Sequence, residues 1–321
     1  MKAVVYDRYG SPDVLSIREA PQPVPGDNEL LVRVHAASIN SWDLGMVTGE
    51  PFVFRFWGLW KPRHQIPGGD VAGVVEQVGR NVSKFKPGDE VFGDLAECGW
   101  GGYAEYVSAP EKAFLLKPHD MSFEQAASIP QAGALAVQAL VTKGQIQQGQ
   151  KVLINGAGGG VGTFALQIAK AYGAQVTAVD SAYKLDMLST LGADHLIDYT
   201  AEDFTSNGKR YDLIVDVVSN RSPVIYKHSL NPGGAFYMIG GDVSSLLQAG
   251  LFGPVISKLS RRHIGILAYE ANKSIDVITR LFSAGKLSPV IDKIFPLNET
   301  REAFQYFASN KFIGKIVIRM C

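Results

Sequence analysis

The sequence from Leu153 to Asp180, LINGAGGGVGTFALQIAKAYGAQVTAVD, places a run of glycines between two apolar segments. The segment before the run, KVLI, is typical of a buried strand, and the segment after it, TFALQIAKAYG, has the apolar spacing of a helix. Glycines at such a turn let the backbone approach a ligand closely, and the amides at the start of the helix can donate to phosphate oxygens. The pattern therefore predicts a dinucleotide-binding α/β unit, with a purely structural glycine turn as the alternative.

Asp180 bears on which dinucleotide is bound. It ends the next predicted strand, at about the separation expected for a carboxylate that accepts the ribose hydroxyls of NAD. Ser181 and Lys184 follow at once and could instead bind the 2′-phosphate of NADP. The sequence thus favours NADH and leaves NADPH open. The predicted phosphate loop consists of Gly158, Gly159, Gly160, Val161 and Gly162, with Ala157 at the first glycine position of the usual fingerprint.

Charge and cysteine content exclude several classes of protein. The 31 basic residues balance the 31 acidic residues, so the chain lacks the positive charge that nucleic acid or an anionic membrane would attract, and we expect neither partner. The apolar runs are shorter than a bilayer span, and the start, MKAVVYDRYG, does not resemble a signal peptide. Two cysteines cannot form a disulfide framework, which indicates a cytoplasmic protein.

The pattern of predicted elements changes twice along the chain. The first 120 residues contain short strand-like runs between Pro/Gly/Asp turns, which is typical of an irregular barrel or sandwich. A helix is expected after Ser122, its N-cap, with Gln125 at the third helical position. From Lys151 onward strands and helices alternate, as in a doubly wound parallel sheet of the Rossmann type. We place the boundaries of the three segments at residues 1–122, 123–266 and 267–321.

Several segments in the same order carry a family resemblance. They are MKAVVYDRYGSPDVLSIREAPQPVPGDNELLVRVHAASINSWD, IPGGDVAGVVEQVG, FKPGDEVFG, GGYAEYV, NGAGGGVGTFALQIAKAYGA, LGADHLIDY and the terminal GKIVI. The chain resembles the zinc-independent quinone oxidoreductase branch of the medium-chain dehydrogenase/reductases. This resemblance implies a β-rich GroES-like catalytic domain, from segments 1–122 and 267–321, around a Rossmann domain at 123–266. It also implies an active site between the two domains.

Three positions decide the expected chemistry. Where the zinc-dependent members of the superfamily carry metal ligands, this chain has Asn40, the pair Gly69-Asp70 and, by our alignment, Ala132. These side chains are poor zinc ligands, so we expect no metal. Without a Lewis acid, reduction of quinones or α,β-unsaturated carbonyl compounds by hydride from NAD(P)H is the leading expectation. A metal-free alcohol or ketone dehydrogenase and a non-catalytic dinucleotide-binding redox sensor are the alternatives.

The resemblance also implies roles for single residues. Asn40 would lie near the nicotinamide and donate to a carbonyl oxygen, with Asp43 and Trp42 beside it. Asp43 and Asp70 have a structural alternative as buried, hydrogen-bonded carboxylates. Besides the loop, the expected cofactor contacts are Asp180, Ser181, Lys184, Tyr199, Val217, Val218, Ile239, Gly240, Leu267 and Lys315, the last offsetting pyrophosphate charge.

The aromatic segment PFVFRFWGLWKPRHQ, Pro51 to Gln65, has no clear helical or strand spacing. One interpretation is a lid over a planar apolar acceptor, since aromatic side chains line many such pockets. The other is a loop packed on the core or buried in a contact between two copies. We expect a homodimer and a small-molecule quinone or enone as the only other partner.

Overall fold

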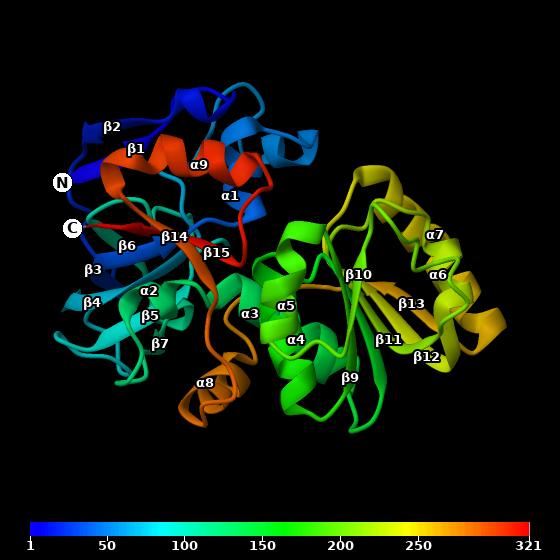
Figure 1. The fold of residues 1–321 in the computed structure, drawn as a ribbon. Helices are drawn as coiled ribbons and strands as arrows, with labels where there is room; N and C mark the ends of the chain where they lie inside the picture. The colour runs from blue at the N-terminus through cyan, green and yellow to red at the C-terminus, as the bar shows by residue number, and fades with distance from the viewer. Residues whose placement is uncertain (321) are drawn as a thin grey trace. The chain divides into compact units, whose positions relative to one another are not determined.

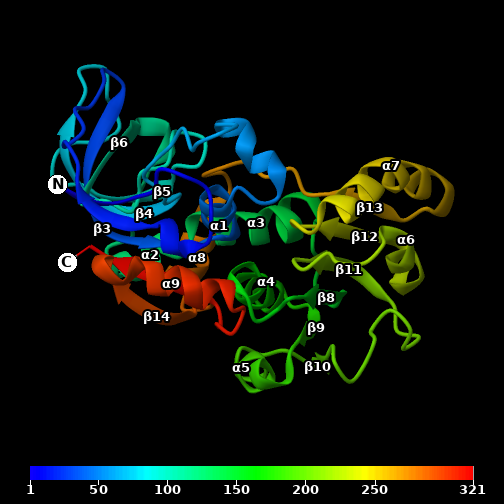
Figure 2. The same ribbon diagram turned by 90° about the horizontal axis from the view of Figure 1, so that it is seen from above.

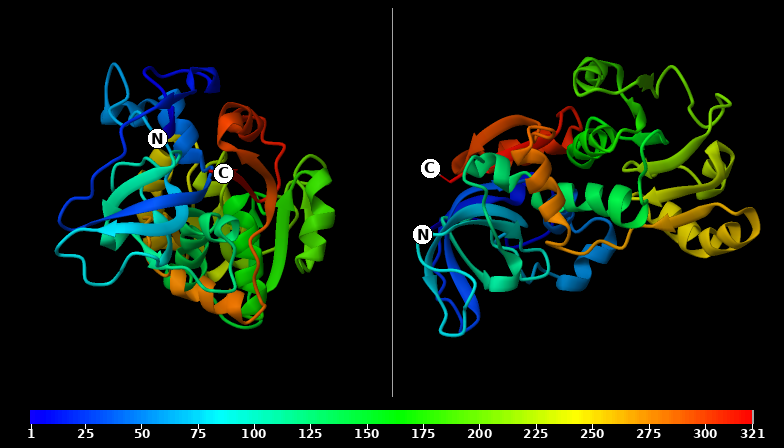
Figure 3. Two further views of the ribbon diagram at one scale, coloured as in Figure 1. Left: turned by 90° about the vertical axis from the view of Figure 1, so that its left-hand side faces the viewer. Right: turned by 90° about the horizontal axis from the view of Figure 1, so that it is seen from below.

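A computed structural model describes residues 1–320, and its contacts divide the chain into two units. Unit 1 comprises Met1–Ala132, Ala271–Lys273 and Pro289–Cys321, and unit 2 comprises Gly133–Glu270 and Ser274–Ser288. The first stretch of unit 1 thus ends at Ala132, whereas the expected boundary lies at 122, and most of segment 267–288 belongs to unit 2. Both chain ends belong to unit 1 (Figure 3).

Unit 2 is built on one six-stranded parallel sheet, as the alternating pattern predicts. The strand order is β10-β9-β8-β11-β12-β13, so the chain reverses direction across the sheet between β8 and β11. This is the Rossmann order, in which ligands bind beside the carboxyl ends of the strands at the reversal point. The strands are β8 (Lys151–Asn155), β9 (Gln175–Asp180), β10 (His195–Asp198), β11 (Tyr211–Asp216), β12 (Leu230–Met238) and β13 (His263–Ile266).

Helices lie on both sides of this sheet (Figures 1 and 2). Helices α4 and α5 lie on one side, next to β8, β9 and β10, and helices α6 and α7 lie on the other, next to β12 and β13. The expected helix after the glycines is confirmed, because α4 begins at Gly160. The helices are α4 (Gly160–Ala171), α5 (Leu185–Thr190), α6 (Pro223–Tyr226), α7 (Val243–Ser260) and α8 (Ile275–Ser283).

Helix α7 is unusual because its solvent-facing side is apolar. Val243, Leu247, Leu251, Val255 and Leu259 recur every fourth residue and are between 47% and 79% exposed. Residues at this spacing lie on one face of a helix, so they form a continuous apolar stripe. Within residues 1–320, no helix combines the length and the apolarity that a bilayer crossing requires.

Unit 1 is β-rich, as the resemblance implies. Its main sheet has the order β14-β15-β3-β4-β5-β7, with β6 also paired to β3, and β1 and β2 form a separate pair. Buried apolar side chains of β1, β3, β4, β5, β6 and the C-terminal strand β15 meet in one core. The strands are β1 (Lys2–Val5), β2 (Ser16–Glu19), β3 (Glu29–Ser38), β4 (Asp70–Val78), β5 (Glu90–Asp94), β6 (Tyr106–Pro110), β7 (Leu115–Leu116), β14 (Ile291–Pro296) and β15 (Lys315–Arg319).

The helices of unit 1 include one that the sequence predicts in atomic detail. Helix α2 (Phe123–Ala127) begins with a capping box, in which Ser122 Oγ accepts from the Gln125 amide and Gln125 Oε1 accepts from the Ser122 amide. The other helices are α1 (Ser41–Thr48) and α9 (Thr300–Ala308), and α3 (Pro130–Val137) crosses the boundary into unit 2 and is followed by a π-helical turn to Lys143.

Strand register brings three polar residues to one end of the main sheet. Ser38 at the end of β3 pairs with Asp70 at the start of β4, and Asp70 pairs with Asp94 at the end of β5. On its other side, Ser38 pairs with Val317 of the C-terminal strand β15. Residues that follow β3 or begin β15 therefore lie near Asp70.

Candidate functional site

The side chain of Asn40 is held by two charged groups in unit 1. Asn40 lies between β3 and α1, and its Nδ2 donates to Asp70 Oδ2 at 2.9 Å. Its Oδ1 accepts from Lys315 Nζ at the start of β15. Because these two partners need opposite ends of the amide, they fix its orientation. One hydrogen of Nδ2 is used by Asp70, which leaves the second for a further acceptor.

Asp70 and Lys315 form a buried ion pair. The distance from Lys315 Nζ to Asp70 Oδ2 is 3.6 Å, and the two side chains are 2% exposed or less. Asp70 Oδ1 also accepts from the amide of Gln131 in the first turn of α3, at 3.0 Å. Burial raises the pKa of Asp70 and lowers the pKa of Lys315, and the attraction between the two charges opposes both shifts.

Asp43 is buried beside this pair, on α1. Its Oδ2 accepts from the Asn40 amide at 2.8 Å and its Oδ1 accepts from the Gly69 amide at 3.0 Å. Burial raises the pKa of Asp43 to about 7, although both backbone donors and the Lys315 charge favour the ionised form. The structural alternative for Asp43 and Asp70 thus agrees with their surroundings. The indole of Trp42, on the same helix, is 39% exposed.

A zinc ion does not fit the residues around Asn40. The amide of Asn40 and the carboxylate of Asp70 are bound to the Lys315 ammonium group, so a divalent cation there would face a buried positive charge. Ala132 is buried and offers no ligand atom. Zinc sites in proteins use thiolates, imidazoles and carboxylates. Among residues 1–320, no group of three or more His, Cys, Asp or Glu side chains could hold a metal ion.

In unit 2, the glycine loop has a shape that side chains would block. A Cβ atom on Gly162 would lie 2.2 Å from the carbonyl oxygen of Gly156 and 2.5 Å from Cα of Ala157. A Cβ atom on Gly158 would lie 2.6 Å from Cδ of Lys184. The first turn of α4 therefore packs directly on the loop before it, which fits a nicotinamide dinucleotide with its pyrophosphate at the helix N-terminus.

Asp180, Ser181 and Lys184 are brought together with this loop. Asp180 Oδ2 accepts from the Gly158 amide at 2.7 Å, and Oδ1 accepts from the Ser181 amide at 2.8 Å. Lys184 Nζ lies 3.6 Å from Asp180 Oδ1, and both side chains are about nine-tenths buried. The carboxylate that would accept ribose hydroxyls thus sits beside a lysine that partly neutralises it.

The other expected cofactor residues of unit 2 follow the carboxyl ends of parallel strands. Val217 and Val218 come after β11, and a Cβ on Gly156 would lie 2.9 Å from Cγ2 of Val218. The side chains of Ile239 and Leu267, after β12 and β13, are buried. The remaining two expected cofactor residues are Tyr199 and Gly240. Tyr199 follows β10 and is 54% exposed, and Gly240 has a φ of 73°. Their contacts with a cofactor stay predictions.

Lys315 was expected at the pyrophosphate but has other partners in unit 1. Its ammonium group donates to the carbonyl oxygen of Ile39 at 3.3 Å and to Asn40, and it pairs with Asp70. The sequence shows only a lysine at the start of the last apolar strand, and its partners follow from the pairing of β15 with β3. A role of Lys315 at the pyrophosphate remains a prediction.

Sequence reasoning missed Asp216, a buried carboxylate at the end of β11. It accepts from Asn155 Nδ2 at 2.8 Å and from the amides of Val218 and Ser219 at 3.1 and 2.8 Å, and also from the Tyr226 hydroxyl. These bonds fix the loop that contains Val217 and Val218. The available signal was an aspartate directly after the apolar run LIV of this strand.

The raised pKa of Asp43 predicts a pH dependence of stability. The folded protein holds this proton up to about pH 7, whereas the ordinary pKa is 3.8, so the folded state binds more protons between these values. The contribution of Asp43 to the free energy of unfolding therefore falls as pH rises from about 4 to about 7, by up to about 1.4 kcal/mol per pH unit. Urea titrations across this pH range should show that the free energy of unfolding falls less steeply with pH in Asp43→Asn than in the wild type.

The test is the slope of the free energy of unfolding against pH, and not the stability at any one pH. An amide offers one acceptor oxygen to two backbone donors, so Asp43→Asn should be less stable at pH 5. Asp120→Asn, at an exposed carboxylate of the same unit, is the matched control and should keep the wild-type slope. Parallel curves for wild type and Asp43→Asn would contradict the assignment.

Comparisons with known proteins agree with both units. The family model for the alcohol dehydrogenase GroES-like domain matches residues 26–119, and that for zinc-binding dehydrogenases matches residues 191–318. The chain is 32% identical to quinone-oxidoreductase QR1 of Triphysaria versicolor, over 99% of this chain and 98% of that protein. It is 33% identical to the NADPH-dependent alkenal/one oxidoreductase of Arabidopsis thaliana, over 99% of this chain and 79% of that protein.

A solved structure extends the agreement to the fold. The quinone oxidoreductase of Coxiella burnetii is 31% identical, superposes with a TM-score of 0.90, and covers 100% of this chain and 99% of its own. The family assignment rests on identity above 30% over the full length, on the Rossmann strand order and on the GroES-like domain. The chain belongs to the quinone oxidoreductase-like branch of the medium-chain dehydrogenase/reductase family.

Proposed function

We propose that the chain reduces quinones and α,β-unsaturated carbonyl compounds with NAD(P)H and without a catalytic zinc ion. The observation that carries the proposal is the Asn40 amide, which is fixed by Asp70 and Lys315. The family resemblance implies that Asn40 occupies the position of a zinc ligand in the zinc-dependent members. The names of the Triphysaria and Arabidopsis relatives support this substrate class. When bound, the nicotinamide supplies the hydride, and an acceptor that is already electrophilic needs no Lewis acid.

The residues of unit 1 would bind and polarise the acceptor. The second hydrogen of Asn40 Nδ2 would donate to the carbonyl oxygen, where negative charge develops during reduction. The Lys315 ammonium group, in contact with Asn40 Oδ1, would make the amide a stronger donor through charge-assisted polarisation. Because the pair is buried, its field is screened less than a surface charge would be.

Replacement of Asn40 tests this role. Asn40→Ala should lower kcat for quinone reduction roughly 10²- to 10³-fold, the cost of losing one donor to a developing oxyanion. The dissociation constant of NADH should stay within about twofold of wild type, because unit 2 carries the proposed cofactor contacts. Steady-state assays with a panel of quinones, enones and saturated ketones, with metal analysis of the same sample, provide the measurement.

Ser41→Ala is the matched control, since Ser41 is the exposed neighbour on the same turn. It should keep wild-type kcat. A wild-type kcat in Asn40→Ala would remove the proposed role of the amide. Stoichiometric zinc would overturn the zinc-independent assignment. Faster turnover of saturated ketones than of quinones would favour the metal-free alcohol or ketone dehydrogenase alternative instead.

For the cofactor, we infer a preference for NADH with NADPH also used. The Asp180 carboxylate lies on the Gly158 amide, where it suits two ribose hydroxyls and would repel a 2′-phosphate. Lys184, 3.6 Å away, would soften that repulsion, which supports the use of both cofactors. The Arabidopsis relative, named NADPH-dependent, shows that NADPH use occurs among similar chains.

Asp180→Ala should raise the ratio of kcat/KM for NADPH to that for NADH by about tenfold or more, because Lys184 then faces the 2′-phosphate alone. Affinity for both cofactors should fall, since the Gly158 amide loses its acceptor. Asp186→Ala, an equal change of charge at an exposed position nearby, should leave the ratio unchanged. An unchanged ratio in Asp180→Ala would show that this carboxylate does not select the cofactor.

We also propose that two copies associate through β13 and α7. β13 is the last strand of its sheet, so its outer edge can pair with a second copy, and the α7 stripe beside it would be covered.

Sedimentation equilibrium should give a dimer for wild type and a monomer for Leu251→Glu with Val255→Glu. Lys258→Glu, on the same helix, should remain dimeric, and an unchanged mass in the double variant would exclude this interface.

A further inference from the structure

Large apolar side chains are exposed together on the segment from Phe52 to Trp60 of unit 1. Phe52 is 58% exposed, Phe56 is 75% exposed and Trp60 is 90% exposed. Val53 and Leu59, in the same segment, are nearly half exposed. Isolated exposed apolar residues are common, but a contiguous group of aromatic rings on a folded surface marks a site of interaction. Packing on the core therefore does not account for these three rings.

The base of this segment is firmly attached to unit 1. The Tyr9 hydroxyl donates to the carbonyl oxygen of Gly58 at 2.6 Å. Arg55 Nε donates to the carbonyl oxygen of Gly49 at 3.3 Å, and the guanidinium carbon lies 5.2 Å from the centre of the Tyr9 ring. Phe54 packs against α1 so closely that a Cβ on Gly45 would lie 2.4 Å from its ring. The exposed rings are thus presented by an anchored segment, which begins with the 3-10 helix Phe52–Trp57.

Local charge identifies the kind of surface that this segment fits. No Asp or Glu occurs between Glu50 and Asp70, whereas Arg55, Lys61 and Arg63 do. Lys61 and Arg63 are exposed immediately after Trp60. Tryptophan beside lysine and arginine is the combination found at membrane interfaces, where the rings enter the headgroup region and the cations meet phosphates. The zero net charge of the chain does not oppose this, because salt screens charges beyond about 8–10 Å.

We propose that the segment from Pro51 to Gln65 docks the protein on the surface of an anionic lipid bilayer. Phe52, Phe56 and Trp60 enter the interfacial region, and Lys61 and Arg63 bind lipid phosphates. The docking is independent of the reductase assignment. One consequence rests on the proposed function: apolar quinones and enones partition into bilayers, so docking brings the enzyme to its acceptors.

Sedimentation with vesicles tests the docking. The full chain should bind vesicles of equal phosphatidylglycerol and phosphatidylcholine at least tenfold more tightly than vesicles of phosphatidylcholine alone, and 0.5 M salt should weaken binding. Phe56→Ser with Trp60→Ser should lower the affinity at least tenfold, as should Lys61→Gln with Arg63→Gln. Thermal unfolding checks that each variant is folded. If the aromatic variant does not fold, the proposal is tested with Lys61→Gln and Arg63→Gln.

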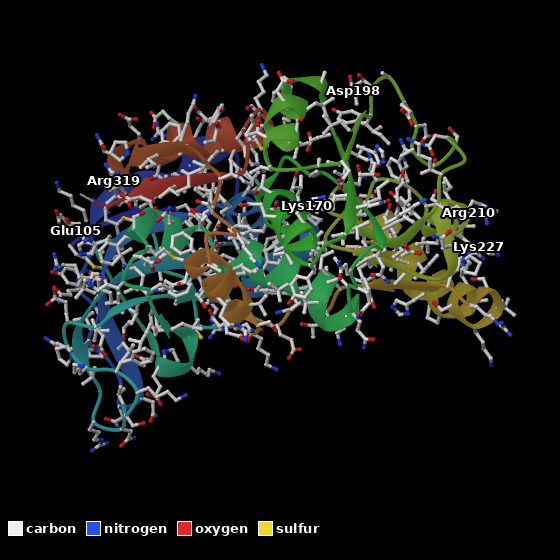
Figure 4. All side chains as sticks on the ribbon, turned by 60° about the horizontal axis from the view of Figure 1, so that its bottom comes forward. Glu105, Lys170, Asp198, Arg210, Lys227 and Arg319 are labelled. Carbon is white, nitrogen blue, oxygen red and sulfur yellow. The ribbon has the colours of Figure 1, made fainter. Side chains whose placement is uncertain are left out.

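Matched controls use exposed residues elsewhere. Val24→Ser with Leu116→Ser removes exposed apolar groups from unit 1, and Lys209→Gln with Arg210→Gln removes two cations from unit 2, where Arg210 is labelled in Figure 4. Both should bind vesicles as wild type does. Brominated acyl chains should quench tryptophan emission in the wild type, and Trp60→Phe should lose most of that quenching while still sedimenting with vesicles.

Three results would overturn the proposal. The first is no binding to phosphatidylglycerol vesicles at low salt. The second is unchanged vesicle binding in both loop variants; a higher KM for apolar acceptors in Phe56→Ser with Trp60→Ser would then make the segment a lid. The third is a change of self-association in that variant without vesicle binding, which would make it a contact between copies. None of these depends on the cofactor or on Asn40.

Discussion

The buried ammonium group of Lys315 organises the polar centre of unit 1. It pairs with Asp70 and donates to Asn40, two residues that are far from it in sequence. Three adjacent strands bring the groups together, because β15 pairs with β3 and β3 pairs with β4. Asp70 also accepts from Gln131 at the start of α3, so one ion pair connects the C-terminal strand, the Asn40 turn and that helix.

Such a cluster is costly to bury and is stable only when its members satisfy one another. Removing one partner of a buried ion pair typically costs about 3–5 kcal/mol, because the other charge is left uncompensated. Asp43 is satisfied in this cluster because its carboxylate accepts from two backbone amides, and burial raises its pKa to about 7. The arrangement gives Asn40 a single orientation, which is what a donor to a developing oxyanion requires.

The Rossmann unit was predictable because its signals are local. The glycine run and the helix from Gly160 lie within a few residues of each other, and the helix is found as expected. In unit 1, the capping box of Ser122 and Gln125 is equally local and is also found. Helix α7 was not predicted, since its exposed face is as apolar as its buried face and gives no amphipathic pattern. Helix α1 was missed as well, because Gly45 interrupts a short segment whose packing depends on Phe54.

The sequence identified candidate residues that the structure brings together, but it did not identify the contacts between them. Asn40, Asp43 and Asp70 follow from motif positions, and Asp180 from its distance to the glycines. The partners of Lys315 depend on the pairing of residues 36–38 in β3 with residues 317–319 in β15. No local sequence pattern encodes this pairing. Contacts between segments far apart in the sequence likewise place 274–288 in unit 2, which no local pattern encodes.

The most direct test of the account is the double variant Asp70→Asn with Lys315→Met. It removes both charges together, so that no buried charge is left unpaired. If the pair positions Asn40, kcat for quinone reduction should fall at least tenfold, while the dissociation constant of NADH from fluorescence titration stays within twofold of wild type. Weakened NADH binding with an unchanged kcat would contradict the account and place Lys315 at the pyrophosphate instead.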